Sequence, residues 1–394
     1  MDSTTIPTNS TPVKERAHTI AYIEGDHPGP CVLFIGGVHG NEPSGVTALQ
    51  QVADALPLHD ITGTFIALAG NLPALRKGQR YEKQDLNRLW TEENIQQLSS
   101  GTFTPTDSDE EQLKALYKTI DDILASERGP FFFFDLHTTS SDTPPFITVN
   151  DSLLNRSFTS RYPIPTILGI EEYLDGPLLS YYNELGYISF GFEAGQHEAR
   201  SSIESHVAFI YLTLQFTGLL KLNGGLFQKY YNLLSHRGRY GHAFFEIYEI
   251  YKIHDGEDFS MEPGYSNFQK IRHGEHIANS NGHPIRPDAD TTIFMPLYQN
   301  QGNDGFFYVK RTRHIFLKLS AWLRKIHADR LLLILPGVTR HPHRTDRLVV
   351  DKRVARYFTK PILHLLGYRA RTIDKNNLYI DSRDKNSKAS DYNL

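Results

Sequence analysis

The stretch Val32-Leu33-Phe34-Ile35-Gly36-Gly37-Val38-His39-Gly40-Asn41-Glu42 is the most informative segment for the fold. It begins as an apolar run, which is typical of a buried strand, and it ends in glycines that surround His39 and Glu42. Apolar residues at helical spacing follow over 43–56, and Pro43 suits the start of a helix because its missing N–H costs little there. A strand that leads through a glycine turn into a helix indicates an α/β fold.

Strands and helices continue to alternate up to about residue 220. We predict strands at 61–69, 131–136, 166–170 and 187–192 and helices at 109–126 and 203–220. This alternation indicates a largely parallel sheet covered by helices, whose sites form at the carboxyl ends of the strands. His39, His137 and Glu193 each lie at or just past the end of a predicted strand, so they can converge.

The second half of the chain has a different pattern. Short alternating runs with frequent Gly, Pro and Asn indicate a small β domain, and residues 315–326 have the spacing of an amphipathic helix. We therefore predict four parts: a polar tail (1–17), an α/β domain (18–225), a small β domain (226–312) and a basic, partly helical extension with a disordered end (313–394).

Composition excludes several classes of protein. The chain has 394 residues, 39% of them hydrophobic and 22% charged, as in an ordinary globular protein. Its single cysteine, Cys31, rules out an intrachain disulfide. We see no secretory signal and no apolar run near the roughly 18 residues that cross a membrane. We therefore expect a cytoplasmic protein, and a homo-oligomer is compatible with the sequence.

Charge is distributed unevenly along the chain. The segment 310–371 has 16 basic and 3 acidic residues, a net +13, whereas residues 1–309 carry a net −17. This basic segment either packs on the acidic body, is solvated, or binds an anionic partner such as membrane headgroups. It contains no recognisable nucleic-acid motif, so a nucleic acid is not the expected partner.

Two imidazoles and a carboxylate are the ligand set of a catalytic zinc with an open position. His39 and Glu42 are three residues apart, which brings both side chains to one side of a turn, but His-x-x-Glu alone is weak evidence. His137 leaves a strongly apolar strand and is either a hydrogen-bonded core residue or a ligand. Asp135 either orients an imidazole from the outer shell or caps the loop. Together with Asn87 and Arg88, which could hold a carboxylate or a carbonyl, they predict a zinc-dependent hydrolase for an acylated, acidic small molecule.

A zinc hydrolase also needs a base and a cation for the developing negative charge. Glu193 ends an apolar strand, where partial desolvation raises the pKa of a carboxyl; the alternative is a capping or ion-paired role. Arg80 and Arg88 are the candidate cations, because the guanidinium fork suits a carboxylate or carbonyl, although exposed arginines are common.

Six ordered motifs resemble the succinylglutamate desuccinylase/aspartoacylase family of zinc carboxypeptidase-like hydrolases. They are Gly37-Val38-His39-Gly40-Asn41-Glu42, Asn71-Leu72-Pro73-Ala74-Leu75, Arg80-Tyr81, Asp85-Leu86-Asn87-Arg88, Asp135-Leu136-His137 and Glu193-Ala194-Gly195. The resemblance covers roughly residues 18–310. It implies an α/β fold with a zinc-carboxypeptidase-like mixed sheet flanked by helices, followed by the small β domain and the basic helical extension.

The resemblance also implies roles for individual residues. One zinc ion per chain would be held by three ligands: His39, Glu42 and His137. Glu193 would be the general base, and Arg80 would polarise the scissile carbonyl. Asn87 and Arg88 would bind the acyl-side carboxylate of the substrate, and Tyr298 would line the site from the β domain. The reaction would be hydrolysis of an N-acylated amino acid or similar small amine.

The sequence departs from the family pattern at one point. Aspartoacylases carry a further Arg and Tyr shortly before the general base, but residues 175–186 contain no arginine and offer Tyr181, Tyr182 and Asn183. The identity of the leaving amine therefore stays open. Two alternative functions remain: a metallocarboxypeptidase for peptides, and a non-catalytic binding protein that uses the basic extension.

Overall fold

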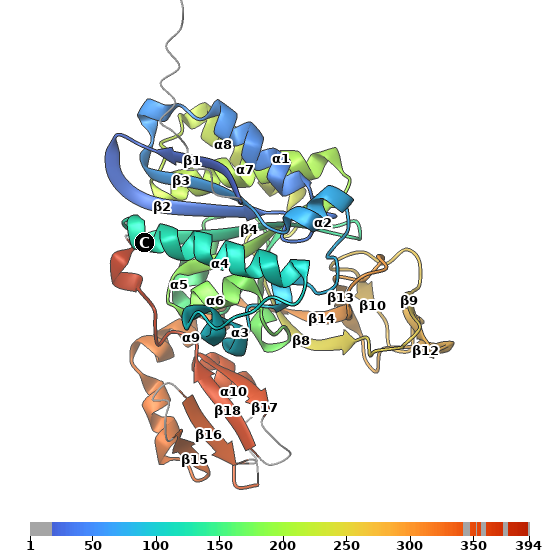
Figure 1. Ribbon diagram of the computed structural model, residues 1–394. Helices are drawn as coiled ribbons and strands as arrows, with labels where there is room; N and C mark the ends of the chain where they lie inside the picture. The colour runs from blue at the N-terminus through green and yellow to red at the C-terminus, as the bar shows by residue number, and fades with distance from the viewer. Residues whose placement is uncertain (1–17, 342–346, 352, 356–359, 373–376, 393–394) are drawn as a thin grey trace, which may run out of the picture.

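The computed structural model describes residues 18–341, 347–351, 353–355, 360–372 and 377–392. Within these residues, an eleven-stranded mixed sheet runs in the order β1-β3-β2-β4-β7-β5-β6-β8-β14-β13-β10 (Figure 1). Its strands are β1 (Thr19–Glu24), β2 (His27–Gly36), β3 (Thr62–Ala69), β4 (Phe131–Thr139), β5 (Phe146–Val149), β6 (Thr166–Leu168), β7 (Ile188–Gln196), β8 (Phe244–Lys252), β10 (Lys270–Ile271), β13 (Thr291–Phe294) and β14 (Asp304–Thr312). The predicted α/β fold class with a mixed sheet is confirmed.

The centre of the sheet is parallel. β2 pairs in parallel with β3 and β4, and β4 pairs in parallel with β7, whereas β1 adds an antiparallel edge. The carboxyl ends of β2, β4 and β7 therefore meet at one edge, and His137 is the direct register partner of Glu193. This register explains how residues far apart in sequence reach one place.

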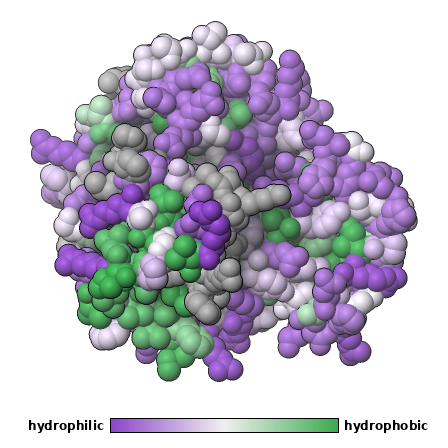
Figure 2. All heavy atoms as spheres, turned by 90° about the horizontal axis from the view of Figure 1, so that it is seen from below, coloured by the Kyte–Doolittle hydropathy of each residue, from purple (hydrophilic) through white to green (hydrophobic). Residues whose placement is uncertain are grey.

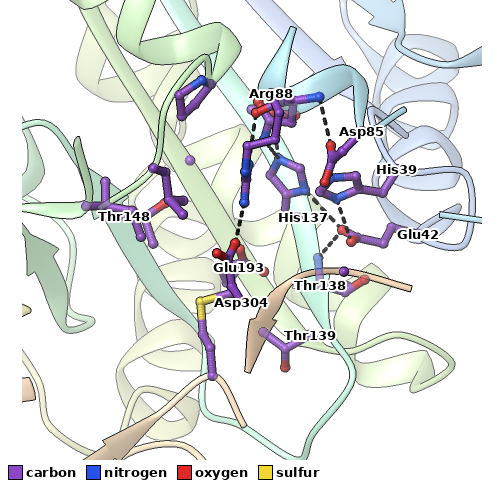
Figure 3. A pocket seen from close by; sticks show the side chains of 18 of the residues that line it. His39, Glu42, Asp85, Arg88, His137, Thr138, Thr139, Thr148, Glu193 and Asp304 are labelled. Carbon is purple, nitrogen blue, oxygen red and sulfur yellow. Dashed lines mark hydrogen bonds and ion pairs between the residues drawn. The ribbon is translucent and has the colours of Figure 1, made fainter. Parts of the chain in front are cut away.

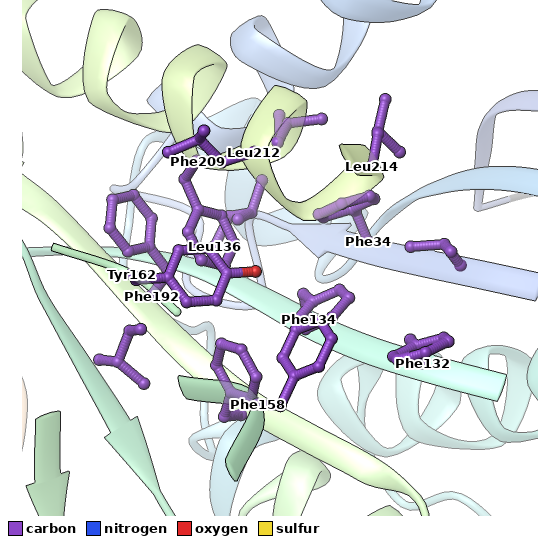
Figure 4. Close-up of a cluster of buried hydrophobic side chains, with 14 of the residues drawn as sticks. Phe34, Phe132, Phe134, Leu136, Phe158, Tyr162, Phe192, Phe209, Leu212 and Leu214 are labelled. Atoms are coloured by element: carbon purple, nitrogen blue, oxygen red, sulfur yellow. The ribbon is translucent and has the colours of Figure 1, made fainter. Parts of the chain in front are cut away.

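Helices cover both faces of the sheet (Figure 1). One face carries α1 (Ser44–Ala55), α7 (Arg200–Thr217) and α8 (Gly224–Arg237), and the other carries α3 (Glu92–Ser99), α4 (Ser108–Ser126) and α6 (Leu178–Glu184). Side chains of a strand alternate between faces, so Phe34 belongs to the core under α7 while Leu33 belongs to the core under α4. Figure 4 shows the aromatic part of the first core, in which Phe192 stacks on Phe209 at 4.1 Å between ring centroids.

The region predicted as a small β domain is built largely of strands. β8 pairs in parallel with β6, and β14, β13 and β10 follow, so these four strands extend the main sheet. A three-stranded sheet, β12-β11-β9, stands beside them, from β9 (Phe259–Met261), β11 (Ala278–Ser280) and β12 (His283–Ile285). The loop 295–303, between β13 and β14, returns to the carboxyl edge of the central strands.

The extension, which the sequence predicted to be partly helical, contains helices and also a sheet that the sequence did not predict. The predicted helix at 315–326 is present as α9 (His314–Lys325), followed by η4 (Ala328–Ile334) and α10 (Lys360–Leu365). A four-stranded antiparallel sheet, β15-β16-β18-β17, accompanies them. Its strands are β15 (Val338–Arg340), β16 (Arg347–Asp351), β17 (Tyr368–Thr372) and β18 (Asn377–Ser382). In β16 only Leu348 and Val350 are buried, so the flanking charges obscured a short strand pattern.

The structure describes residues 383–392, which fall within the end that the sequence predicted to be disordered, and places them against the body. Tyr392 is buried, and its hydroxyl donates to the carbonyl of Phe131 at 2.5 Å and accepts from the amide of Ile188 at 3.1 Å. One aromatic residue in a polar segment thus fastens the end of the chain to β4 and β7. The predicted tail at 1–17 and residues 393–394 lie outside the described residues.

The contact between the extension and the body is ionic. Arg324 donates to Asp151 at 3.2 Å, and Arg369 lies 2.5 Å from Glu184. Arg383 reaches Asp151 at 2.7 Å and contacts the carboxylates of Glu171 and Glu172 as well. The sequence left open whether the basic segment packs on the acidic body, is solvated or binds an anionic partner. These arginines pack on the acidic body.

Candidate active site

Three side chains that could hold a metal ion meet at the carboxyl edge of β2 and β4 (Figure 3). His39 and Glu42 lie in the turn between β2 and α1, and His137 lies near the end of β4. One ligand atom from each falls within 4.8 Å of the others, and all three residues are buried. The turn needs glycine: a Cβ on Gly40 would lie 2.1 Å from the carbonyl carbon of Ala74.

Two further carboxylates orient the imidazoles. Asp85 accepts from His39 Nε2 at 3.0 Å, and Asp135 accepts from His137 Nε2 at 2.6 Å. The two Nδ1 atoms consequently face Glu42, at 2.9 Å and 3.1 Å from its carboxylate oxygens. Metal-binding histidines commonly give their second nitrogen to such a carboxylate, which fixes the tautomer. The donor set therefore fits a metal ion, and of the two readings of Asp135 the structure favours orientation of an imidazole.

Glu193 lies beside this cluster with unused hydrogen-bonding capacity. It is 6% exposed, and no described residue donates to its Oε2 atom. Burial raises the pKa of Glu193 to about 8, and the carboxylates of Glu42 and Asp135 add to this effect while His137 opposes it. A buried, unpaired carboxyl of this kind can take up and release a proton near neutral pH.

Arg80 also reaches the cluster. Its Nη2 donates to Asp85 at 3.1 Å, and its Nη1 lies 3.7 Å from the carboxylate of Glu42. Its carbonyl accepts from the amide of Gly40 at 3.1 Å, so the segment around Arg80 is tied to the ligand turn. The guanidinium is thus held next to the three candidate ligands.

Asn87 and Arg88 are engaged within the protein. The Asn87 Oδ1 accepts from the amide of Leu178 at 3.0 Å, which fastens the start of α6 to the site. Arg88 donates through Nη2 to Asp304 of β14 at 2.7 Å. The arginine that the sequence assigned to a substrate carboxylate already holds a carboxylate of its own chain.

These residues line one cavity of about 140 Å³. Its lining includes His39, Glu42, Arg80, Asn87, Arg88, His137, Glu193 and Asp304, together with a neutral part formed by Thr148, Asn150, Ile170, Leu174, Leu179, Ser180, Ser189, Met295 and Phe307. The structure thus brings together every predicted site residue except Tyr298. The Tyr298 hydroxyl donates to the carbonyl of Glu262 at 2.8 Å, and the adjacent Leu297 and Gln299 line the cavity instead.

Among the lining residues that sequence reasoning missed are Asp304, Gln299 and His197. His197 lines the cavity and bonds Thr138 at 2.8 Å and Gln299 at 3.2 Å. Its position just past the carboxyl end of β7 was the available signal. His206, in contrast, is completely buried, which lowers the pKa of its imidazole to about 3.

The structure thus defines a class: α/β proteins with a mixed sheet and, at its carboxyl edge, a buried His-Glu-His cluster that is compatible with a metal site. Residues 28–208 match the succinylglutamate desuccinylase/aspartoacylase catalytic domain. This part of the chain matches that family, and the names of the family's members indicate a deacylase. The predicted family is confirmed.

Curated relatives match over a shorter segment. The chain is 29% identical over 116 residues to the succinylglutamate desuccinylase of Serratia proteamaculans, covering 28% of this chain and 33% of that protein. It is 30% identical over 112 residues to the succinylglutamate desuccinylase of Yersinia pestis strain Pestoides F, covering 27% of this chain and 31% of that protein. The chain therefore spans about a third of the length of the curated relatives it matches.

Solved structures resemble a larger part of the chain. A succinylglutamate desuccinylase/aspartoacylase from Rhodobacter sphaeroides aligns with a TM-score of 0.54 at 18% identity, over 74% of this chain and 88% of that one. The product-bound ectoine utilization protein of Ruegeria pomeroyi aligns with a TM-score of 0.53 at 17% identity, over the same shares. At these identities the likeness establishes the fold.

Proposed function

We propose that this protein is a zinc-dependent hydrolase that removes the acyl group from an N-acylated amine. The observation that supports it most strongly is the pairing of two imidazole Nδ1 atoms with Glu42, fixed from behind by Asp85 and Asp135. When bound, zinc supplies Lewis acidity for a carbonyl group and for water. His39, Glu42 and His137 are the residues that would hold it.

The other side chains have separate tasks in this proposal. Glu193 takes the proton from the attacking water and later gives it to the departing amine, for which the pKa of about 8 is suited. Arg80 donates to the oxygen of the scissile carbonyl as negative charge develops there. Asn87 positions the start of α6, and with it the neutral wall of the cavity.

The charges of the cavity favour one class of substrate. Arg88 is neutralised by Asp304, and Arg80 by Asp85. Apart from these pairs, the three candidate metal ligands, Asp135, Glu193 and His197, the lining is neutral. We infer that the substrate is neutral or cationic next to Arg88, because an acyl-side carboxylate would have to displace Asp304. This inference narrows the set of N-acyl amino acids that are expected as substrates. It disfavours N-succinylated and N-acetylated acidic amino acids.

Metal content tests the first part of this proposal. We expect about one zinc ion per chain in the purified protein by elemental analysis, and its loss in His137→Ala. His283→Ala, at an exposed histidine of β12, is the matched control and should retain zinc. If zinc is absent and is not taken up when added, or if His137→Ala retains it, the metal assignment is wrong.

A substrate panel tests the second part. We expect wild-type protein to hydrolyse neutral and cationic N-acetyl amines better than N-succinylglutamate. Asp304→Asn should raise kcat/KM for N-succinylglutamate by about tenfold, since a charge-assisted pair with Arg88 contributes on the order of 1.5–3 kcal/mol. Equal activity of the two proteins on N-succinylglutamate would show that Asp304 does not control the substrate.

A metallocarboxypeptidase remains the alternative enzyme. Such an enzyme needs a cation for the terminal carboxylate of a peptide, and each arginine of this cavity is paired with a protein carboxylate. Cleavage of blocked dipeptides at a rate above that of N-acyl amines would favour it over the deacylase.

A further inference from the structure

α9 exposes an apolar face. Ile315, Phe316, Leu319 and Trp322 are 68%, 53%, 40% and 56% exposed. Ile326, just past the end of the helix, is 53% exposed. These positions recur every three to four residues, so they form one stripe along the helix. An apolar stripe that faces outward is unusual for a helix of a globular protein.

The stripe continues into η4. Leu331, Ile334 and Leu335 are 63%, 77% and 41% exposed, and we call these eight residues the α9–η4 patch. The patch provides half of the sixteen large hydrophobic residues that are exposed in the described part of the chain. Figure 2 shows a continuous apolar area on this side of the molecule. A concentration of this kind marks an interaction surface rather than scattered apolar residues.

The inner face of α9 is already used by the body. Ser320 and Arg324 are buried, and Arg324 donates to the carbonyl of Asp151 at 3.0 Å and to its carboxylate at 3.2 Å. These bonds fix the rotation of the helix about its axis. The apolar stripe is therefore held outward, where packing within the described chain does not cover it.

Exposed cations surround the patch. Arg313, Lys318, Lys325 and Arg330 are exposed, and residues 311–340 contain seven basic residues against one acidic residue, Asp329. The carboxylate of Asp329 accepts from the hydroxyl of Tyr368 at 2.9 Å. The surface is consequently apolar in the middle and positive at its rim, whereas residues 1–309 carry a net −17.

We propose that the α9–η4 patch docks this protein on an anionic lipid surface. A helix with one apolar face, a tryptophan and basic neighbours lies in the plane of a bilayer, with its apolar side chains among the acyl chains and its cations at the headgroups. A second copy of the chain is the less suitable occupant, because a two-fold contact would bring the two positive rims together. The acidic body would orient the patch toward the membrane.

Intrinsic fluorescence gives a direct test. The chain has two tryptophans, of which Trp90 is 4% exposed and Trp322 is 56% exposed. Phosphatidylcholine vesicles that contain phosphatidylglycerol should shift the emission to the blue and allow quenching by brominated acyl chains. Pure phosphatidylcholine vesicles should do neither. The full-length protein should also sediment with the anionic vesicles.

Matched variants separate the apolar contribution to vesicle binding from the electrostatic one. Phe316→Glu should weaken vesicle binding by about tenfold or more, because burial of a phenylalanine side chain is lost. Leu58→Glu, at an equally exposed leucine (53%) of another region, should bind as the wild type does. Lys318→Glu combined with Lys325→Glu should weaken binding by about fivefold for each lysine, whereas Lys118→Glu combined with Lys221→Glu should have little effect.

Several outcomes would overturn the proposal. Absence of binding to anionic vesicles, equal binding to neutral vesicles, or unchanged binding of the Phe316→Glu variant would each do so. Sedimentation equilibrium tests whether the patch joins two copies of the chain. A dimer that dissociates in the Phe316→Glu variant would assign the patch to a second copy. Circular dichroism of each variant checks that the chain is folded, and zinc content provides a readout that docking does not affect.

Discussion

Two buried carboxylate clusters in this protein have opposite electrostatics. At the candidate active site, Glu193 is buried without a cation of its own, and burial raises its pKa to about 8. At the contact between body and extension, Asp151 is equally buried, but Arg156, Arg324 and Arg383 surround it. Burial alone would raise the pKa of Asp151, yet the three guanidinium groups hold it well below its usual range.

The difference separates chemistry from structure. A carboxylate surrounded by arginines stays charged and serves as a fixed anchor, whereas an unpaired one can change its protonation state near neutral pH. The first arrangement attaches the extension to the body. The second provides a proton acceptor next to three candidate metal ligands.

The largest effect is expected at Glu193. Glu193→Gln should reduce turnover by about 10²–10⁴-fold, the usual contribution of a general base, while zinc content stays unchanged. Glu198→Gln, at an exposed position five residues later, is the control and should keep full activity. Steady-state kinetics on the best N-acyl substrate measure both. Full activity of Glu193→Gln would show that Glu193 is not the general base, and the proposed difference in role between the two clusters would then be wrong.

The next effect concerns Arg383. Arg383→Met should lower the free energy of unfolding by about 3–5 kcal/mol, since Asp151, Glu171 and Glu172 would lose a shared partner inside the protein. Arg353→Met, which breaks an ion pair with Asp351 on a side chain that is 67% exposed, should cost at most about 1 kcal/mol. Urea unfolding compares them; equal losses would mean that burial of the network does not matter.

The smallest effect is a pH dependence of stability. The lowered pKa of Asp151 contributes stability above the unfolded value of about 3.9, and this stability is lost as the pH falls toward the folded value. Asp151→Asn should therefore reduce the loss of stability below about pH 4 by roughly 1–2 kcal/mol. Asp26→Asn, at a carboxylate that is 68% exposed, should leave the acid limb unchanged. If the free energy of unfolding falls equally with pH below about 4 in Asp151→Asn and in the wild type, this linkage is wrong.

Local sequence patterns predicted much of the central architecture. The strands that became β3, β4 and β7 and the helices that became α1, α4 and α7 were read from apolar periodicity. The convergence of His39, His137 and Glu193 followed from one rule, namely that the carboxyl ends of parallel strands share an edge. These inferences succeed because each depends on residues that are neighbours in the chain or on the general geometry of parallel sheets.

Other features depended on contacts between distant segments. Nothing near Asp304 indicates that β14 brings it to Arg88, 216 residues earlier. Tyr298 and Gln299 are adjacent, yet the fold of the loop places only Gln299 in the cavity. The strands of the extension were hidden because β15 buries one apolar side chain and β16 buries two, between polar or charged neighbours.

The sequence by itself determined the α/β core, the family of the catalytic region and the residue types available for a metal centre, because periodicity and motif order are local properties. Only the tertiary structure decided which nitrogen of each histidine faces Glu42, which carboxylate neutralises Arg88, and which face of α9 remains uncovered. Those outcomes depend on strand register and on charges that come together across the fold, and the energy of a buried charge is set by the groups that surround it.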